Sequence, residues 1–203
     1  MNGNAAIAPN LIQHTPNSVI TVAVLGAEST GKTTLCRDLA AYFGSLWVPE
    51  YMRLYLQAKW DDKQLTCTWD DLLPIAQGQI ALENELAKQV AQMPDENRYL
   101  FCDTSLFELM VYANWYYDDC PDALTLAALT HHYDLIILTD IDTPWVADDL
   151  RDSPHQREEI SAFFASQLTD HQQSFYCVGG DRSERVQKVV ERLSKMNQLP
   201  RAK

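Results

Sequence analysis

The sequence predicts an α/β fold in which helices cover both faces of a five-stranded parallel sheet, a three-layer αβα arrangement. Short apolar runs rich in β-branched residues alternate with segments of helical periodicity, which is typical of a parallel sheet. A glycine-rich loop joins the first apolar run to the first helical segment. The length of 203 residues suits one domain that carries an inserted lid.

The strands and helices are expected in strict alternation over most of the chain. Apolar runs of strand length lie at residues 19–25, 46–48, 99–102, 135–138 and 175–178. Helical spacing of apolar residues follows at residues 35–43, 70–90, 106–117, 123–130 and 186–193. Gly44 is the expected C-cap of the first helix, and Asp70 is the expected N-cap of the long second one.

The expected domain organisation is simple. Residues 1–17 lack hydrophobic periodicity and are interpreted as a flexible N-terminal tail, and residues 198–203 as a C-terminal tail. Residues 18–197 then form the folded domain. Within it, residues 142–158 are polar and contain two prolines and two arginines, Arg151 and Arg157. This segment is the expected lid.

Composition limits the partners. The formal net charge is −12 without a run of Lys and Arg, so nucleic acid is not an expected partner. No apolar run approaches the roughly 18 residues of a membrane span, and no signal peptide is recognisable. The five cysteines form no C-x-x-C pair, which favours a reducing compartment, the cytoplasm. The sequence predicts no oligomeric state.

The glycine-rich loop carries the strongest motif, G-x-x-x-x-G-K-[ST]. Its glycines let backbone N–H groups surround a phosphate, its lysine neutralises the outer phosphates and its final hydroxyl binds Mg²⁺. The loop follows a predicted strand and begins a predicted helix, as the motif of a P-loop NTPase requires. ATP and Mg²⁺ are therefore the expected cofactors. The predicted binding residues are Gly26, Ala27, Glu28, Ser29, Thr30, Gly31, Lys32, Thr33 and, through the α-phosphate, Thr34.

Two carboxylates are candidates for the catalytic chemistry beside Lys32. Asp103 ends the third predicted strand, where it can serve Mg²⁺ together with Thr33, accept a hydroxyl proton or simply cap the next helix. Glu50 follows the second strand and is the alternative base, or else a first-turn helix acid. Arg53 can pair with Glu50 or contact phosphate.

Lid and aromatic residues are weaker candidates. Arg151, more than Arg157, is expected to stabilise charge on the transferred phosphoryl group. Clustered rings, including Tyr51 and Trp145, are more often core than binding surface. The pair His131 and His132 lacks a partner at a metal-ligand spacing and is interpreted as structural.

The motifs also distinguish between classes of nucleotide-binding protein. The fourth strand is followed by Thr139-Asp140-Ile141-Asp142 and not by the guanine-reading N-K-x-D. Thr104 stands where many hydrolytic ATPases carry a second acid after the strand-three aspartate. A kinase of a small molecule is the better prediction.

Several strings resemble the ribosylnicotinamide kinase domain of the NadR-type proteins. Besides the glycine loop, they are Glu50-Tyr51 with Arg53, residues 75–79, Asp103-Thr104, and residues 133–138 and 143–151 in the same order. The resemblance covers about residues 19–196. It implies phosphorylation of the ribose 5′-hydroxyl of nicotinamide riboside by ATP, giving nicotinamide mononucleotide.

The resemblance also implies roles for particular residues. Asp103 and Glu50 become the substrate-side carboxylates, Arg151 the lid arginine, and Gln77 or Gln79 a reader of the carboxamide. Substrate contacts are then expected from Glu50, Tyr51, Arg53, Gln79, Asp103 and Trp145. Aromatic rings and carboxylates suit the cationic nicotinamide ring. The adenylyltransferase domain that usually accompanies this kinase is not expected here. Another nucleoside as substrate, or a regulatory module without catalysis, remains the alternative.

Overall fold

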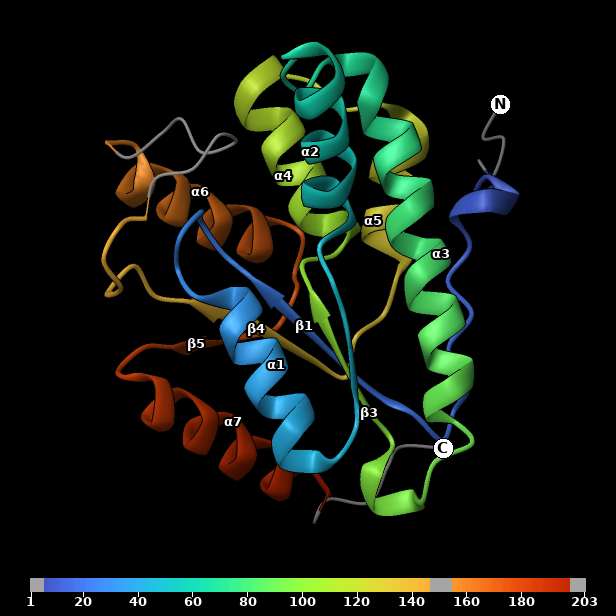
Figure 1. Cartoon of the computed structure of the whole chain (residues 1–203), viewed down its shortest axis with the longest axis vertical. Helices are drawn as coiled ribbons and strands as arrows, with labels where there is room; N and C mark the ends of the chain where they lie inside the picture. Colours follow the sequence, from blue (N-terminus) through green and yellow to red (C-terminus); the bar gives the residue numbers. More distant parts are fainter. Residues whose placement is uncertain (1–5, 147–154, 198–203) are drawn as a thin grey trace.

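A central sheet of five parallel strands has the order β2-β3-β1-β4-β5 (Figure 1). The structure is a computed structural model and describes residues 6–146 and 155–197. The strands are β1 (Ile20–Leu25), β2 (Leu46–Val48), β3 (Tyr99–Asp103), β4 (Leu135–Thr139) and β5 (Phe175–Val178). The predicted parallel α/β fold is confirmed, with each strand within a residue or so of its expected position.

Seven α-helices of the described chain cover the two faces of the sheet. They are α1 (Lys32–Phe43), α2 (Tyr51–Lys63), α3 (Leu72–Val90), α4 (Leu106–Tyr117), α5 (Asp122–Thr130), α6 (Arg157–Asp170) and α7 (Arg182–Asn197). Figure 1 shows α1 and α7 together on one face, with α2 to α5 beyond the other.

Successive strand residues point to opposite faces, and this alternation builds two cores. Val22 and Val24 of β1 pack with Leu35 and Leu39 of α1 on the first face. Ala23 and Leu25 belong to the larger core beneath α3, α4, α5 and α6. Helices therefore cover the sheet on both sides, which explains why the strands read as nearly continuous apolar runs.

Two helices were not predicted from the sequence. In α2 only Leu56 is buried, so the segment has little apolar periodicity to indicate a helix. In α6 the buried residues Ile160, Phe164 and Leu168 recur every four positions, a signal hidden by the polar segment that precedes it. The expected lid therefore ends in a helix that begins at Arg157.

The start of the long helix α3 also differs from the prediction. Asp70 is not its cap. A short 3₁₀ helix, Trp69–Asp71, precedes α3, and the Asp71 carboxylate accepts hydrogen bonds from the backbone N–H (2.7 Å) and the hydroxyl (2.6 Å) of Thr68. Hydrogen bonding and the nearby Lys59 lower the pKa of Asp71 to about 2, against the opposing effect of burial. Asp71 therefore stays ionised and caps this turn.

The N-terminal segment is packed and not a flexible tail from residue 6 onward. Leu11 is 1% exposed and belongs to the larger core. Its carbonyl oxygen lies 2.7 Å from the Nε2 atom of His131, and the Asn84 side-chain oxygen accepts a hydrogen bond from the backbone of His14. The buried leucine and these two contacts attach the segment to the folded domain. His131 is structural, as predicted.

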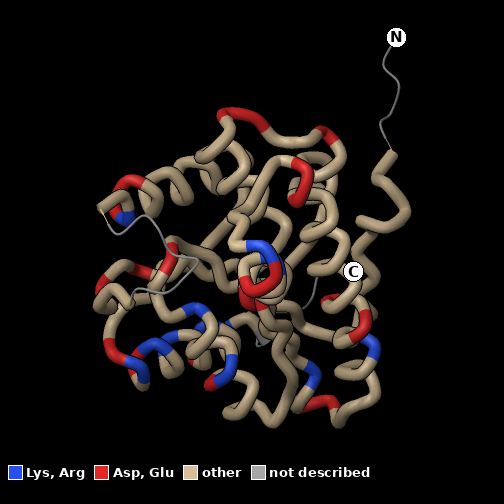
Figure 2. The backbone as a smooth tube through the Cα atoms, turned by 45° about the horizontal axis from the view of Figure 1, so that its top comes forward, with Lys and Arg blue, Asp and Glu red and all other residues tan. Residues whose placement is uncertain are grey.

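The distribution of charged and apolar residues in the structure bears on the partners that the sequence excluded. Asp and Glu positions are spread along the backbone over many helices and loops, and Lys and Arg positions occur among them (Figure 2). No helix within residues 6–146 or 155–197 is long and apolar enough to cross a membrane.

Candidate active site

The glycine loop lies between β1 and α1, at the carboxyl edge of the sheet. Gly26 has a φ of 144°, and a Cβ there would lie 2.4 Å from the Thr139 hydroxyl oxygen. Gly31 has a φ of 84° and directly precedes α1. Neither position accommodates a side chain, because the backbone is left-handed at both and β4 crowds the first. The loop therefore directs its N–H groups and the helix N-terminus at one point, where a phosphate can bind.

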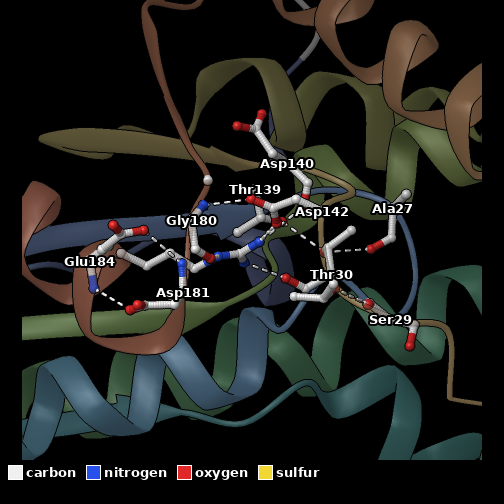
Figure 3. A network of polar contacts seen from close by, with 12 residues as sticks. Ala27, Ser29, Thr30, Thr139, Asp140, Asp142, Gly180, Asp181 and Glu184 are labelled. Atoms are coloured by element: carbon white, nitrogen blue, oxygen red, sulfur yellow. Dashed lines mark hydrogen bonds and ion pairs between the residues drawn. The ribbon is translucent and has the colours of Figure 1, made fainter.

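The outer side of the loop is held by hydroxyl groups and by two arginines. The Thr30 hydroxyl donates to the Ala27 carbonyl oxygen (2.8 Å) and lies 2.7 Å from the Thr139 hydroxyl (Figure 3). Arg185 of α7, 3% exposed, donates to the Thr30 carbonyl oxygen at 2.6 Å. Arg157 of α6 donates to the Ser29 carbonyl oxygen at 3.1 Å. These bonds occupy the carbonyl oxygens of Ser29 and Thr30 on the outer side and fix the conformation of the loop.

Lys32, predicted as the lysine of the motif, is the first residue of α1. Its ammonium group donates to the carbonyl oxygens of Gly26 (2.7 Å) and Ala27 (3.1 Å) and lies 3.2 Å from a carboxylate oxygen of Glu108. Burial acts to lower the pKa of Lys32, but the nearby carboxylates, Glu108 foremost, outweigh it and raise that pKa. Lys32 therefore remains charged and available to phosphate.

Thr33 and Asp103, the two predicted metal ligands, lie together. The Thr33 hydroxyl donates to Asp103 Oδ2 at 2.6 Å, although 70 residues separate them in the chain. Asp103 Oδ1 is buried and has no hydrogen-bond partner within the described part of the chain. A hydroxyl and a carboxylate beside the phosphate loop are the hard oxygen donors that Mg²⁺ prefers. Burial raises the pKa of Asp103, which a divalent cation would reverse.

A cavity of about 850 Å³ extends from the phosphate loop to the space between α2 and α4. Residues 28–34 form its phosphate end. The other end is made of side chains from α2, α3 and α4 and from the turn before α2: Glu50, Met52, Arg53, Leu56, Leu72, Glu108, Leu109, Tyr112, Tyr116 and Tyr117. Thr143, Pro144 and Val146 of the expected lid complete it. A volume of this order holds a ligand of nucleoside size beside phosphates.

The cavity includes some of the predicted substrate residues and leaves out others. Glu50 and Arg53 line it. Tyr51 is not among the lining residues, because its ring lies against Gly78 of α3, where a Cβ would come within 2.0 Å of the ring. Trp145 does not line it either, and its ring instead faces the Arg157 guanidinium at 5.7 Å.

The side-chain amide of Gln79 is hydrogen-bonded inside the protein and is not available to a ligand. The residue is 3% exposed, its amide oxygen accepts from the N–H of Tyr51 (2.9 Å), and its amide nitrogen donates to Glu83 (3.2 Å). Both ends of the amide are therefore used inside the protein, and Gln79 positions the start of α2. The predicted carboxamide contact from Gln79 is wrong for this conformation.

Of the two arginines of the expected lid, the structure describes Arg157. Arg151, the predicted catalytic arginine, lies outside the described residues. Arg157 donates to the carbonyl oxygens of both Ser29 and Thr143 at 3.1 Å, which puts its guanidinium next to the phosphate loop. Its Nε is buried and lacks a hydrogen-bond partner within the described residues.

Glu108 is the main site residue that sequence reasoning missed. It lies in the first turn of α4, is 2% exposed and lines the cavity. One carboxylate oxygen accepts from the N–H of Gly26 (3.1 Å) and the other faces Lys32. Burial raises the pKa of Glu108 to about 8, although Lys32 opposes the shift. A lone acid in the apolar string Leu106-Phe107-Glu108-Leu109-Met110 is the signal that could have identified it.

The far end of the cavity is aromatic. Tyr112 and Tyr116 stack with ring centroids 6.1 Å apart and planes 16° from parallel. Both rings lie one helical turn apart on α4, next to Tyr117 and opposite Leu56 of α2. The sequence favoured a core position for the clustered rings and named Tyr51 and Trp145 as substrate contacts, whereas the rings that line the cavity are those of Tyr112, Tyr116 and Tyr117.

A glycine loop between a parallel strand and a helix, with lysine and threonine at its end and an aspartate from the adjacent strand, defines a P-loop nucleotide-binding protein. The family described as AAA domain matches residues 21–185, and the chain belongs to that family.

The chain is similar to a curated relative and to two solved structures that are NadR proteins. The chain is 29% identical over 184 residues to the trifunctional NAD biosynthesis/regulator protein NadR of Escherichia coli (strain K12), covering 89% of this chain and 43% of that protein. A crystal structure of NadR in complex with NR superposes with a TM-score of 0.72 at 21% identity, over 91% of this chain and 53% of that chain. A NadR complex with NAD and AMP-PNP gives a TM-score of 0.67, also at 21% identity, over 91% of this chain and 51% of that chain. The chain thus spans about half the length of these relatives.

Proposed function

We propose that this protein is an ATP-dependent kinase that phosphorylates the ribose 5′-hydroxyl of nicotinamide riboside, giving nicotinamide mononucleotide. The observation that carries the proposal is one continuous cavity, which joins the phosphate loop to an end lined by tyrosines and carboxylates. A donor nucleotide and an acceptor nucleoside can meet there with the transferred phosphoryl group between them. The similarity to NadR, which has been crystallised with NR and with AMP-PNP, supports this choice.

The phosphate end of the cavity supplies positive charge and N–H groups. Lys32 and the loop N–H groups bind and orient the outer phosphates of ATP, and Arg157 and Arg185 hold the loop from outside. Thr33 and Asp103 would hold Mg²⁺. Mg²⁺, when bound, neutralises charge that develops on the phosphates. Pro144 and Val146 of the expected lid line the cavity, where they would limit the access of water to the transferred group.

The side chains at the acceptor end of the cavity would recognise the base of the nucleoside. Tyr112, Tyr116 and Tyr117 provide aromatic surface for a planar ring, and Glu28, Glu50 and Glu108 line the same cavity. A cationic nicotinamide ring gains both a cation–π contact and Coulomb attraction in such surroundings. A neutral base gains only the stacking. The site is therefore expected to discriminate by charge, as well as by shape.

The test is kcat/KM with Mg-ATP for nicotinamide riboside, its reduced form and cytidine. The reduced riboside has nearly the same shape without the positive charge, so it should be poorer by roughly tenfold if one contact of about 1–2 kcal/mol is lost. Equal values for all three acceptors would contradict the charge argument. Activity on cytidine alone would refute nicotinamide riboside as the substrate. The absence of transfer to every acceptor would leave a nucleotide-binding module.

A further inference from the structure

Glu108 has a position that the binding of ATP alone does not explain. It is the carboxylate in contact with Lys32, at 3.2 Å, and it lines the cavity from the first turn of α4. Oε2 accepts the N–H of Gly26, whereas Oε1 is buried and has the ammonium group of Lys32 as its partner. If Glu108 served only to hold the glycine loop, the hydrogen bond from the Gly26 N–H to Oε2 would be sufficient, and the contact of Oε1 with Lys32 would have no role.

The neighbours of Glu108 change when a nucleotide binds. Lys32 then contacts the outer phosphates, and that contact draws its ammonium group away from Oε1 of Glu108. The carboxylate is left next to the γ-phosphate, facing the cavity in which the acceptor binds. An attacking hydroxyl must lie close to the γ-phosphorus, so Oε1 is within reach of the proton on that hydroxyl.

The two carboxylates predicted from the sequence are less suitable proton acceptors. Asp103 is 1% exposed, is not among the residues that line the cavity, and is bonded to the Thr33 hydroxyl as a metal ligand would be. Glu50 lines the cavity from the N-cap of α2, and its charge acts on both Lys32 and Glu108. Glu108 Oε1 lies 3.2 Å from the ammonium group of Lys32, the lysine that marks the outer phosphates.

We propose that Glu108 is the general base, receiving the proton of the acceptor hydroxyl through Oε1. As the hydroxyl oxygen bonds to the γ-phosphorus, its proton passes to the Glu108 carboxylate. The bond from the γ-phosphorus to the β,γ-bridging oxygen breaks, and ADP leaves with the electron pair. The carboxyl proton is returned to solvent after release of the products. This inference rests on the proposed kinase function, but not on the identity of the nucleoside.

The surroundings of Glu108 predict how kcat/KM should depend on pH. The charged and titratable groups that interact with it are Lys32, Glu50 and Tyr112, while Asp103 acts on Lys32 and Glu28 acts on Tyr112. Burial, with the charge of Glu50, raises the pKa of Glu108 to about 8 against the effect of Lys32. Loss of the Lys32 contact on nucleotide binding raises this pKa further. The ionised form is the base, so kcat/KM for the acceptor should rise by up to about tenfold per pH unit as far as about pH 8.

The experiment compares Glu108→Gln and Glu108→Asp with the wild type. Glutamine keeps an oxygen for the Gly26 N–H but cannot accept the proton, so kcat/KM should fall by about 10²–10⁴-fold and lose its rise towards pH 8. Binding of AMP-PNP, measured by calorimetry, should be no weaker, because a negative charge beside the phosphates is removed. Glu108→Asp keeps a carboxylate and should retain the rise with a smaller loss of rate.

Glu83→Gln is the matched control, because Glu83 is equally buried, has a raised pKa and does not line the cavity. It should keep the wild-type pH profile. A Glu108→Gln profile parallel to that of the wild type would overturn the proposal, as would a loss of AMP-PNP binding with unchanged kcat. If Glu108→Gln does not fold, a flat profile for Glu108→Asp would overturn it.

The choice of acceptor is tested separately, on the wild type. A wild type that prefers another nucleoside refutes nicotinamide riboside as the substrate, and the comparison of variants is then made with that nucleoside. A wild type that transfers phosphate to no acceptor overturns both proposals.

Discussion

Replacing Glu83 by glutamine should stabilise the protein above neutral pH and reduce the loss of stability as pH rises. Glu83 lies in the larger core at 3% exposure, where it accepts hydrogen bonds from the Tyr133 hydroxyl (2.8 Å) and from Gln79 (3.2 Å). Burial outweighs these two bonds and raises the pKa of Glu83 from 4.5 to about 7. The folded protein therefore binds this proton more tightly than the unfolded chain does.

The size and sign of the effect follow from that shift. A raised pKa contributes stability that is complete below about pH 4.5 and is lost as pH rises through about 7. Raising the pKa of Glu83 from 4.5 to about 7 corresponds to about 3 kcal/mol in the free energy of unfolding. Glu108, whose pKa is about 8, adds a second loss of the same sign. Between about pH 5 and pH 7 the wild type should lose stability through both groups, about twice as steeply per pH unit as Glu83→Gln, which keeps only Glu108.

Urea unfolding at several pH values between about 5 and 8 measures these slopes. An amide at position 83 can accept from Gln79 and donate to the Tyr133 oxygen, so both hydrogen bonds have replacements. Glu85→Gln is the control, since Glu85 is exposed on the same helix and the charge changes equally. Equal slopes for wild type and Glu83→Gln would refute the reasoning. Lower stability of Glu83→Gln even above pH 7 would show that Glu83 is favourably ionised in the fold.

Three further predictions concern the phosphate end. Lys32→Ala should leave the fold intact and lower kcat/KM by about 10²–10³-fold, and wild-type turnover would refute the site. Asp103→Asn should raise the Mg²⁺ concentration needed for half-maximal rate by about 10–100-fold, measured by titration of Mg²⁺; an unchanged requirement would exclude Asp103 as ligand. Arg185→Gln should raise the KM for ATP and lower the free energy of unfolding by about 1–3 kcal/mol, because the Thr30 carbonyl loses its donor. Exposed Arg182→Gln should do neither.

The strands and the phosphate loop could be predicted because their signals are local. A β-branched run such as residues 20–25 and the spacing of Gly26, Gly31 and Lys32 specify their conformation within a few residues. Asp103 and Thr33 could also be placed near each other, because both lie at the carboxyl edge of a parallel sheet. Their predicted role in metal binding remains a prediction.

The direction of a side chain on an unpredicted helix was not available from the sequence. Tyr51, Arg53 and Leu56 all lie in or next to the first turns of α2, yet Arg53 and Leu56 line the cavity and Tyr51 packs on Gly78 of α3. The packing of α2 against α3 decides which face of α2 points to α3. Because α2 has few buried apolar residues, its sequence has no apolar stripe that would predict this face.

The sequence by itself determined the class of fold and the phosphate site, since glycine spacing and strand periodicity act over short stretches of backbone. Only the tertiary structure decided the acceptor end of the cavity and the role of its acids. Glu108 contacts Gly26 across 82 residues of chain, and Leu11 is buried by elements far from it in sequence. Burial and long-range contacts, which set the pKa of Glu108 and order the N-terminal segment, exist only once the chain has folded.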